Sequence, residues 1–215
     1  KIKVGSCKWS DICVFSFHAV KSITTSEGGA LLTNKISYFN DIKLSRENGL
    51  KSSFKSSGMI NYNLIKPALN FRISEILAAL GVSQIKKLDK FIKKRNLLAS
   101  YYKKKLTDYP IFIQKIHSFN KSSYHLFIIL LNTKYKIRDR DKIISKLKRK
   151  KYYLNSHYKA LHLTDYFKKL GYKRGDYPNS EFYSDNSISI PIFPQLKKKQ
   201  IDIFLKNLKK ILNEK

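Results

Sequence analysis

The sequence predicts an α/β fold, because short apolar segments typical of strands alternate with longer segments of helical periodicity. Residues 11–17 are apolar, β-branched and aromatic, which predicts a buried strand, and residues 29–34 predict a second strand entered through a glycine turn. Residues 74–106 repeat apolar side chains at helical spacing, which predicts one long helix with Ser74 as its cap. A chain of 215 residues is long enough to bury a substantial core.

The remaining elements follow from the same two periodicities. In chain order they are a helix over 36–47, a polar loop over 48–68, strands over 111–116 and 124–132, a basic helix over 139–151, a strand containing Ile188, Ile190 and Ile192, and a helix over 197–213. We place a domain boundary inside the long helix, which divides the chain into residues 1–95 and 96–215.

The charge is strongly positive, at +29, and this raises the possibility of a nucleic-acid-binding protein. Of the 44 basic residues, 37 are Lys and 7 are Arg, whereas recognition of bases and phosphates favours Arg. The lysines are spread from end to end and accompany an excess of Ile and Asn, which is typical of an AT-rich genome. We therefore do not expect specific nucleic-acid binding, although it remains the alternative from another class.

Neither a membrane span nor a disulfide framework is expected. No apolar run reaches the roughly 18 residues that a membrane-spanning helix requires. Cys7 and Cys13 are the two cysteines, too few for a disulfide scaffold, so a reduced cytoplasm is the simplest setting.

The segment from Phe15 to Ala30 carries the strongest functional signal. It reads Phe-Ser-Phe-His-Ala-Val-Lys up to Lys21 and ends in Glu27-Gly28-Gly29-Ala30. A lysine at the end of a strand in a packed region is poorly solvated, and this is the setting in which an amine becomes a nucleophile. On composition alone, Lys21 would be one more surface lysine. The surrounding residues favour the functional interpretation.

This string resembles the cofactor-lysine segment of the DegT-type sugar aminotransferases, a branch of the fold-type I pyridoxal-phosphate enzymes. The resemblance implies that Lys21 binds pyridoxal 5'-phosphate covalently and then acts as the acid and base of the reaction. It also implies that the hydroxyl of Ser16 binds the cofactor phosphate. His18 belongs to the same motif, but its role is left open between a proton carrier and a packed, hydrogen-bonded residue.

A second motif, Asn70-Phe-Arg72-Ile-Ser-Glu75, resembles the run that opens the long helix in this family. The resemblance implies that Asn70 reaches across a homodimer to the partner's cofactor phosphate. An amide just before a helix N-terminus suits an anion. Arg72 is a candidate substrate-binding residue, with pairing to Glu75 as the alternative.

A third motif, Ser-His157-Tyr158-Lys-Ala160-Leu-His162, resembles a family segment on the substrate side of the site. His157 and Tyr158 are therefore candidate substrate-binding residues. Ala160 stands where the family commonly has Pro. A metal site at His157 and His162 is not expected, since a spacing of five does not place both on one helix face.

The resemblance begins about midway through a typical family member. It implies the C-terminal part of an aspartate aminotransferase-like fold: residues 1–95 from the large cofactor-binding domain and 96–215 as the small α/β domain. The carboxylate that pairs with the cofactor ring nitrogen is not among the acidic residues here, so we expect this part to be inactive alone.

The implied activity is cytoplasmic transamination of a nucleotide-linked keto sugar, with glutamate as amino donor, for polysaccharide biosynthesis. The pattern is nearest to bacterial enzymes that make amino sugars for pseudaminic-acid-type pathways. A sugar dehydratase of the same family is the alternative, although those relatives typically replace the lysine with His. A catalytically silent scaffold also remains open.

Overall fold

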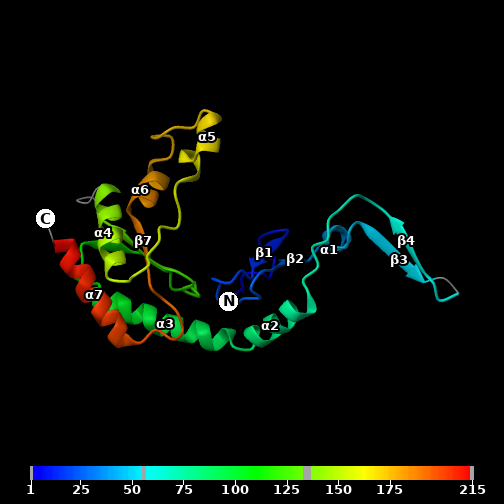
Figure 1. Ribbon diagram of the computed structural model, residues 1–215, viewed down its shortest axis with the longest axis horizontal. Helices are drawn as coiled ribbons and strands as arrows, with labels where there is room; N and C mark the ends of the chain where they lie inside the picture. The colour runs from blue at the N-terminus through cyan, green and yellow to red at the C-terminus, as the bar shows by residue number, and fades with distance from the viewer. Residues whose placement is uncertain (1, 55–56, 133–136, 214–215) are drawn as a thin grey trace. The chain divides into compact units, whose positions relative to one another are not determined.

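The computed structural model describes residues 2–54, 57–132 and 137–213 (Figure 1). The chain forms two compact units, an N-terminal unit, Lys1–Asp89, and a C-terminal unit, Lys90–Lys215. Both contain helices and antiparallel strands, so the predicted mixed α/β class is confirmed. None of the described helices is long and apolar enough to cross a membrane.

The N-terminal unit contains two antiparallel strand pairs and two helices of its own. Strands β1 (Cys13–Ser16) and β2 (Gly29–Leu32) pair, with Ser16 opposite Gly29. Helix α1 spans Ile36–Arg46, and α2 spans Glu75–Ile85. Oγ of Ser74 accepts a hydrogen bond from the backbone N–H of Leu77, so Ser74 caps α2 as predicted.

The segment predicted as a polar loop over 48–68 contains a β-hairpin instead. Strand β3 (Leu50–Phe54) pairs with β4 (Ile60–Leu64), and Leu50 lies opposite Leu64. The prediction was wrong because β3 reads Leu-Lys-Ser-Ser-Phe, whose two apolar residues are too few to show a period of two. Residues 55–56 of this segment lie outside the described residues.

The long helix predicted over 74–106 is two helices. Helix α2 ends at Ile85, and α3 begins at Leu88 and ends at Lys105. Between them the backbone N–H of Lys87 donates to the carbonyl of Gln84, a tighter turn than an α-helix makes. The sequence concealed the break, because Ile85 and Leu88 are three positions apart and continue the apolar periodicity across it.

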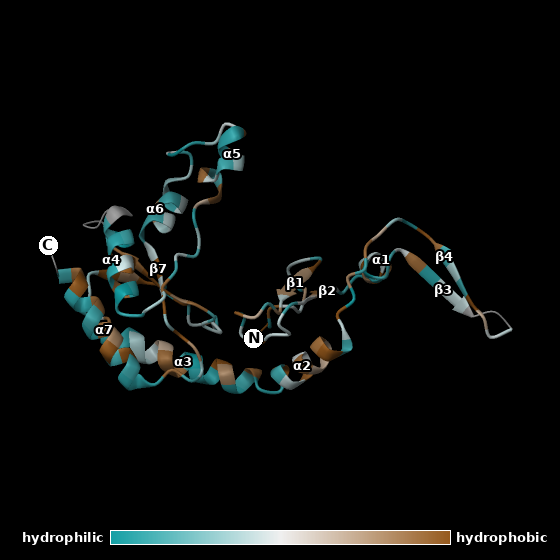
Figure 2. Ribbon diagram, in the orientation of Figure 1, coloured by the Kyte–Doolittle hydropathy of each residue, from teal (hydrophilic) through white to brown (hydrophobic). Residues whose placement is uncertain are grey.

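The first strand is not buried as predicted. Val14 is 70% exposed and Ile12 39% exposed. The reason is that β2 is the one strand that pairs with β1 in the described part of the chain, and such a pair alone cannot bury both of its faces. Every residue of α2 is also at least partly exposed, although Figure 2 shows apolar residues, in brown, along this helix.

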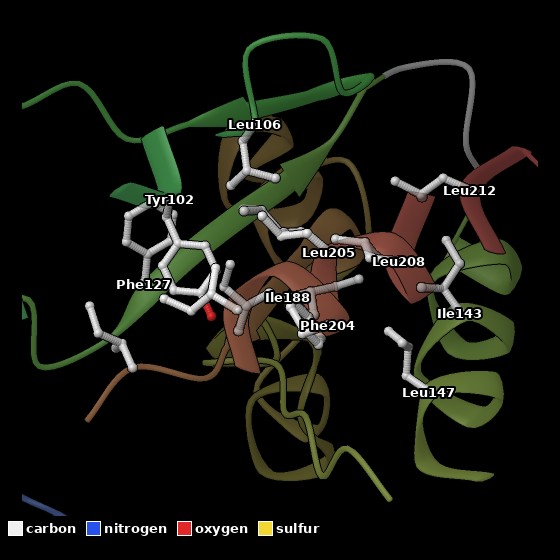
Figure 3. Packing of buried hydrophobic residues seen from close by; sticks show 14 of the residues in the cluster. Tyr102, Leu106, Phe127, Ile143, Leu147, Ile188, Phe204, Leu205, Leu208 and Leu212 are labelled. Carbon is white, nitrogen blue, oxygen red and sulfur yellow. The ribbon is translucent and has the colours of Figure 1, made fainter. Parts of the chain in front are cut away.

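The C-terminal unit has a conventional core between a sheet and three helices. The antiparallel sheet has the order β5 (Ile111–Ile113), β6 (Phe127–Leu131), β7 (Ser187–Ile190). Helix α3 packs with α4 (Ile137–Arg149) and α7 (Lys198–Asn213) around it. Figure 3 shows Tyr102, Phe127, Ile188 and Phe204 within this core.

A buried arginine links three segments of the C-terminal unit. Arg95, on α3, is 6% exposed, and its Nη1 donates to the carbonyls of Tyr124, His125 and Ile192 at 2.8–3.1 Å. Burial lowers the pKa of the guanidinium below its ordinary value. The three carbonyl dipoles partly compensate the buried charge.

Residues 161–186 form short elements that the sequence did not predict. They are a 3-10 turn (Leu161–Leu163), α5 (Asp165–Lys169) and α6 (Pro178–Asn186). A buried pair holds them together, because Nε2 of His162 lies 2.9 Å from Oε1 of Glu181. The 3-10 turn and α5, of three and five residues, are too short to show helical periodicity, and α6 carries only Phe182 and Tyr183 as apolar residues, so it shows no repeat either.

Truncation of a core residue on α7 is expected to destabilise the C-terminal unit. Leu208 is fully buried, whereas Ile203 on the same helix is 49% exposed. Leu208→Ala should lower the free energy of unfolding by about 2–5 kcal/mol. Ile203→Ala, the matched control, should lower it by much less. Hydrogen exchange of the β6 amides in the intact protein measures both. Equal effects would contradict the packing described.

The Glu181 carboxylate is expected to make the C-terminal unit sensitive to acid. The contact with His162, followed by backbone donors and Arg174, lowers the pKa of Glu181 below its ordinary value. The stabilisation is therefore present above the unfolded-state pKa of about 4.3 and is lost as pH falls through the folded-state pKa. Between pH 7 and pH 3, urea unfolding should show a larger loss of stability for the wild type than for Glu181→Gln. The exposed Asp108→Asn should behave as the wild type.

Candidate active site

A single turn connects Ser16 to Lys21. Ser16 is the last residue of β1, and its Oγ accepts a hydrogen bond from the backbone N–H of His18 at 3.4 Å. The backbone N–H of Lys21 then donates to the carbonyl of His18 at 2.9 Å. The hydroxyl of Ser16 and the amine of Lys21 therefore extend from the two ends of one short, hydrogen-bonded segment.

Lys21 is half-buried, and its amine has no acidic partner among the described residues. The nearby carboxylate of Glu27 lies instead 3.6 Å from Nε2 of His18. Nδ1 of His18 accepts a hydrogen bond from the backbone N–H of Val20 at 3.4 Å. His18 is thus held by local contacts. The carboxylate of Glu27 faces His18 and forms no ion pair with the Lys21 amine in the described contacts.

The loop that carries Lys21 is closed at its base by Phe17. The carbonyl of Phe17 accepts hydrogen bonds from the backbone N–H of Thr25 at 2.9 Å and from Oγ1 of Thr24 at 3.0 Å. The backbone N–H of Phe17 donates to the carbonyl of Gly28 at 2.8 Å. The sequence reasoning missed both threonines, although the Thr-Thr pair before the glycine turn was a visible signal.

Asn70 and Arg72 lie at the approach to α2. Asn70 forms an antiparallel bridge with Glu47, and its Oδ1 accepts a hydrogen bond from the backbone N–H of Arg72 at 3.1 Å. The Asn70 side chain is exposed, and its Nδ2 donors are free among the described contacts. The charge of Arg72 acts on Glu47, whose pKa is lowered first by a hydrogen bond from Arg46 and further by Lys43 and Arg72.

His157 and Tyr158 lie in the C-terminal unit. Nδ1 of His157 is 2.7 Å from Oγ of Ser189 on β7, and the hydroxyl of Tyr183 donates to the His157 carbonyl at 3.0 Å. The rings of Tyr158 and His157 meet edge-on, with their centroids 4.7 Å apart, and Tyr158 is otherwise exposed. The sheet therefore fixes His157, which in turn supports the phenol of Tyr158.

The structure thus brings Ser16 and Lys21 together, and separately Asn70 and Arg72, within the N-terminal unit. The described residues contain no group of three His, Cys, Asp or Glu side chains that could hold a metal ion.

The DegT/DnrJ/EryC1/StrS aminotransferase family matches residues 3–209 of this chain. An uncharacterized protein of Methanocaldococcus jannaschii is 30% identical over 218 residues, covering 99% of this chain and 56% of that protein. The UDP-4-amino-4,6-dideoxy-N-acetyl-beta-L-altrosamine transaminase of Campylobacter jejuni is 36% identical over 170 residues, covering 78% of this chain and 43% of the transaminase.

Solved structures agree with these matches. PseC of Helicobacter pylori, an aminotransferase involved in the biosynthesis of pseudoaminic acid, is 29% identical, with a TM-score of 0.85 over 95% of this chain and 54% of PseC. The putative sugar aminotransferase Spr1654 of Streptococcus pneumoniae, in its PMP-form, has a TM-score of 0.88 at 24% identity over 96% of this chain and 54% of Spr1654, which confirms the fold.

The chain spans about half the length of the relatives it matches. The matched region contains all three motifs that carried the resemblance. The chain belongs to the DegT/DnrJ/EryC1/StrS aminotransferase family.

Proposed function

We propose that this chain supplies the cofactor lysine of a pyridoxal-phosphate-dependent aminotransferase that acts on a nucleotide-linked keto sugar. The observation that carries the proposal is the short turn that joins Ser16 to a half-buried Lys21 without an acidic partner in the described contacts. Family membership and a relative named as a UDP-sugar transaminase support the substrate class.

The residues present fit a phosphorylated aldehyde. Oγ of Ser16 accepts from His18, which leaves its O–H free to donate to a phosphate oxygen. The Lys21 amine makes no ion pair with a carboxylate in the described contacts, so its nitrogen is available to an aldehyde carbon. When bound, pyridoxal phosphate supplies an electron sink for charge that develops on the substrate carbon.

Three side chains, those of Lys21, Ser16 and Asn70, carry the proposed cofactor chemistry. In each of the two half-reactions, Lys21 Nζ would act first as a base, which takes a proton from one carbon, and then as an acid, which returns it to another. Ser16 and, from the other subunit of a homodimer, Asn70 hold the phosphate. The free Nδ2 donors of Asn70 and its place before α2 support this assignment.

The substrate side is proposed to include Arg72, His157 and Tyr158. Arg72 offers a permanent positive charge to a diphosphate or a donor carboxylate. His157 is held by Ser189, and the exposed Tyr158 phenol offers a donor and an apolar face to a sugar ring. Glutamate as amino donor, a cytoplasmic location, and residues 1–95 and 96–215 as cofactor-binding and small domains complete the proposal.

Reduction with borohydride in the presence of pyridoxal phosphate should attach the cofactor to the peptide that contains Lys21. The experiment uses the protein expressed from its natural gene and identifies the modified peptide by mass spectrometry. Lys21→Arg should abolish the label and lower transamination by at least about 100-fold, because the proton carrier is lost. Lys43→Arg, an exposed lysine on α1, should change neither. Labelling at another lysine of the wild type would refute the assignment.

Removal of the Ser16 hydroxyl should weaken cofactor binding. A hydrogen bond to a charged group contributes about 1.5–3 kcal/mol, so Ser16→Ala should raise the Kd for pyridoxal phosphate by about 10- to 100-fold. The exposed Ser83→Ala on α2 is the control and should bind as the wild type. Fluorescence titration measures both constants. An unchanged Kd for Ser16→Ala would remove Ser16 from the phosphate site.

A further inference from the structure

Thr25 is unusual in the N-terminal unit. Among the residues of this unit whose burial the structure describes, it is the one with a buried side chain, at 3% exposure. Apolar residues nearby are far more exposed, with Val14 at 70% and Val20 at 65%. A buried polar side chain in a unit with so little core requires a specific set of contacts.

Those contacts join the two ends of the Lys21 loop. The backbone N–H of Thr25 donates to the carbonyl of Phe17 at 2.9 Å, at the start of the loop. Its Oγ1 donates to the carbonyl of Glu27 at 2.7 Å, at the end of the loop. The hydroxyl of Thr25 is therefore satisfied by the backbone of the loop.

Two glycines make room for this side chain. A Cβ added at Gly28, whose φ is +148°, would lie 2.5 Å from Oγ1 of Thr25. A Cβ added at Gly81, in the middle of α2, would lie 2.9 Å from Cγ2 of Thr25. Both distances are too short for real atoms, so α2 approaches Thr25 as closely as it does because residue 81 has no side chain.

We propose that Thr25 is a positioning residue that fixes the amine of Lys21. The set formed by Thr25, the backbone carbonyls of Phe17 and Glu27, and the surface of α2 at Gly81 is called the threonine clasp. Lys21 lies between the two points that the clasp joins, and it makes no ion pair in the described contacts that would hold its side chain. The clasp thus sets where the Lys21 backbone sits relative to Ser16 and to α2.

This inference rests on the proposed function, because positioning matters only if Lys21 reacts. The clasp also joins two motifs distant in sequence, since α2 follows directly after the segment with Asn70. A reacting group displaced by about 1 Å can lose about 100-fold in rate. Loosening the clasp should therefore alter the reactivity of Lys21 beyond any effect on stability.

The test compares four variants of the clasp and one control variant, all in the protein expressed from its natural gene. Thr25→Val keeps the shape and removes the hydroxyl donor, whereas Thr25→Ser keeps the donor and removes Cγ2. Gly81→Ala inserts the Cβ that would meet Cγ2, and the double variant Thr25→Ser with Gly81→Ala removes that clash again. Thr107→Val is the matched control, because it removes a hydroxyl bonded to a backbone carbonyl, that of Lys104 on α3.

Two readouts report on Lys21 itself. One is the rate at which pyridoxal phosphate and cyanoborohydride label Lys21, and the other is the pH at which the visible absorption of the bound cofactor changes. Thr25→Val and Gly81→Ala should each slow labelling by about 10- to 100-fold and shift that pH. Thr25→Ser and Thr107→Val should resemble the wild type, and the double variant should recover most of the rate lost in Gly81→Ala.

The outcomes separate the inference from the function on which it rests. If Lys21 of the wild type is labelled, but Thr25→Val and Gly81→Ala keep its rate and titration and differ only in thermal stability, the clasp has no positioning role. If wild-type Lys21 is not labelled at all, the proposed function and the inference are both wrong. If Gly81→Ala does not fold, Thr25→Val decides, and recovery of folding by the double variant supports the close contact.

Discussion

The hydrogen bonds to the carbonyl of Phe17 are the constraint on which the candidate site depends. Phe17 directly follows β1, so anything bound to its carbonyl is held at a fixed place relative to that strand. Thr24 and Thr25 both donate to it and thereby close the loop that contains Lys21. Without this closure, Lys21 would belong to an open surface loop, and a flexible lysine is strongly solvated and unreactive. One backbone acceptor thus ties the residues that follow Lys21 back to the end of β1.

Much of the fold was predictable because the C-terminal unit follows simple periodicities. The continuous apolar run of β6 (Phe127–Leu131) lies at buried and half-buried positions, and the repeat of Ile201, Phe204, Leu208 and Ile211 on α7 corresponds to buried ones. The N-terminal unit was harder. Its β3–β4 hairpin is rich in Ser and Asn, and Val14 of β1 is exposed while Phe15 is only half-buried, so pattern alone misjudged both segments. Hydrophobic periodicity predicts burial correctly only where another segment of the chain packs against the apolar face.

Candidate site residues could be predicted from the sequence only where they belong to a motif. Ser16, Lys21, Asn70 and the His157–Tyr158 pair were predicted from motif strings, which reflect chemistry rather than packing, and they stay predictions. Thr25 was not predicted, because the role proposed for it depends on its burial and on the absence of a side chain at Gly81, more than fifty positions away. A close approach between distant segments has no local sequence signature. The proposed role of Thr25 could therefore be inferred only from the three-dimensional structure.

Arg95 and the His162–Glu181 pair imply an order of opening under acid. The guanidinium keeps its charge at any acidic pH, so its bonds to the carbonyls of Tyr124, His125 and Ile192 persist as protons are added. The pair that holds residues 161–186 instead depends on a carboxylate that acid neutralises. Acidification should first release residues 161–186, from the 3-10 turn to α6, while the sheet and α3 stay joined. The C-terminal unit would then open in two separate stages, residues 161–186 first and the core around Arg95 later.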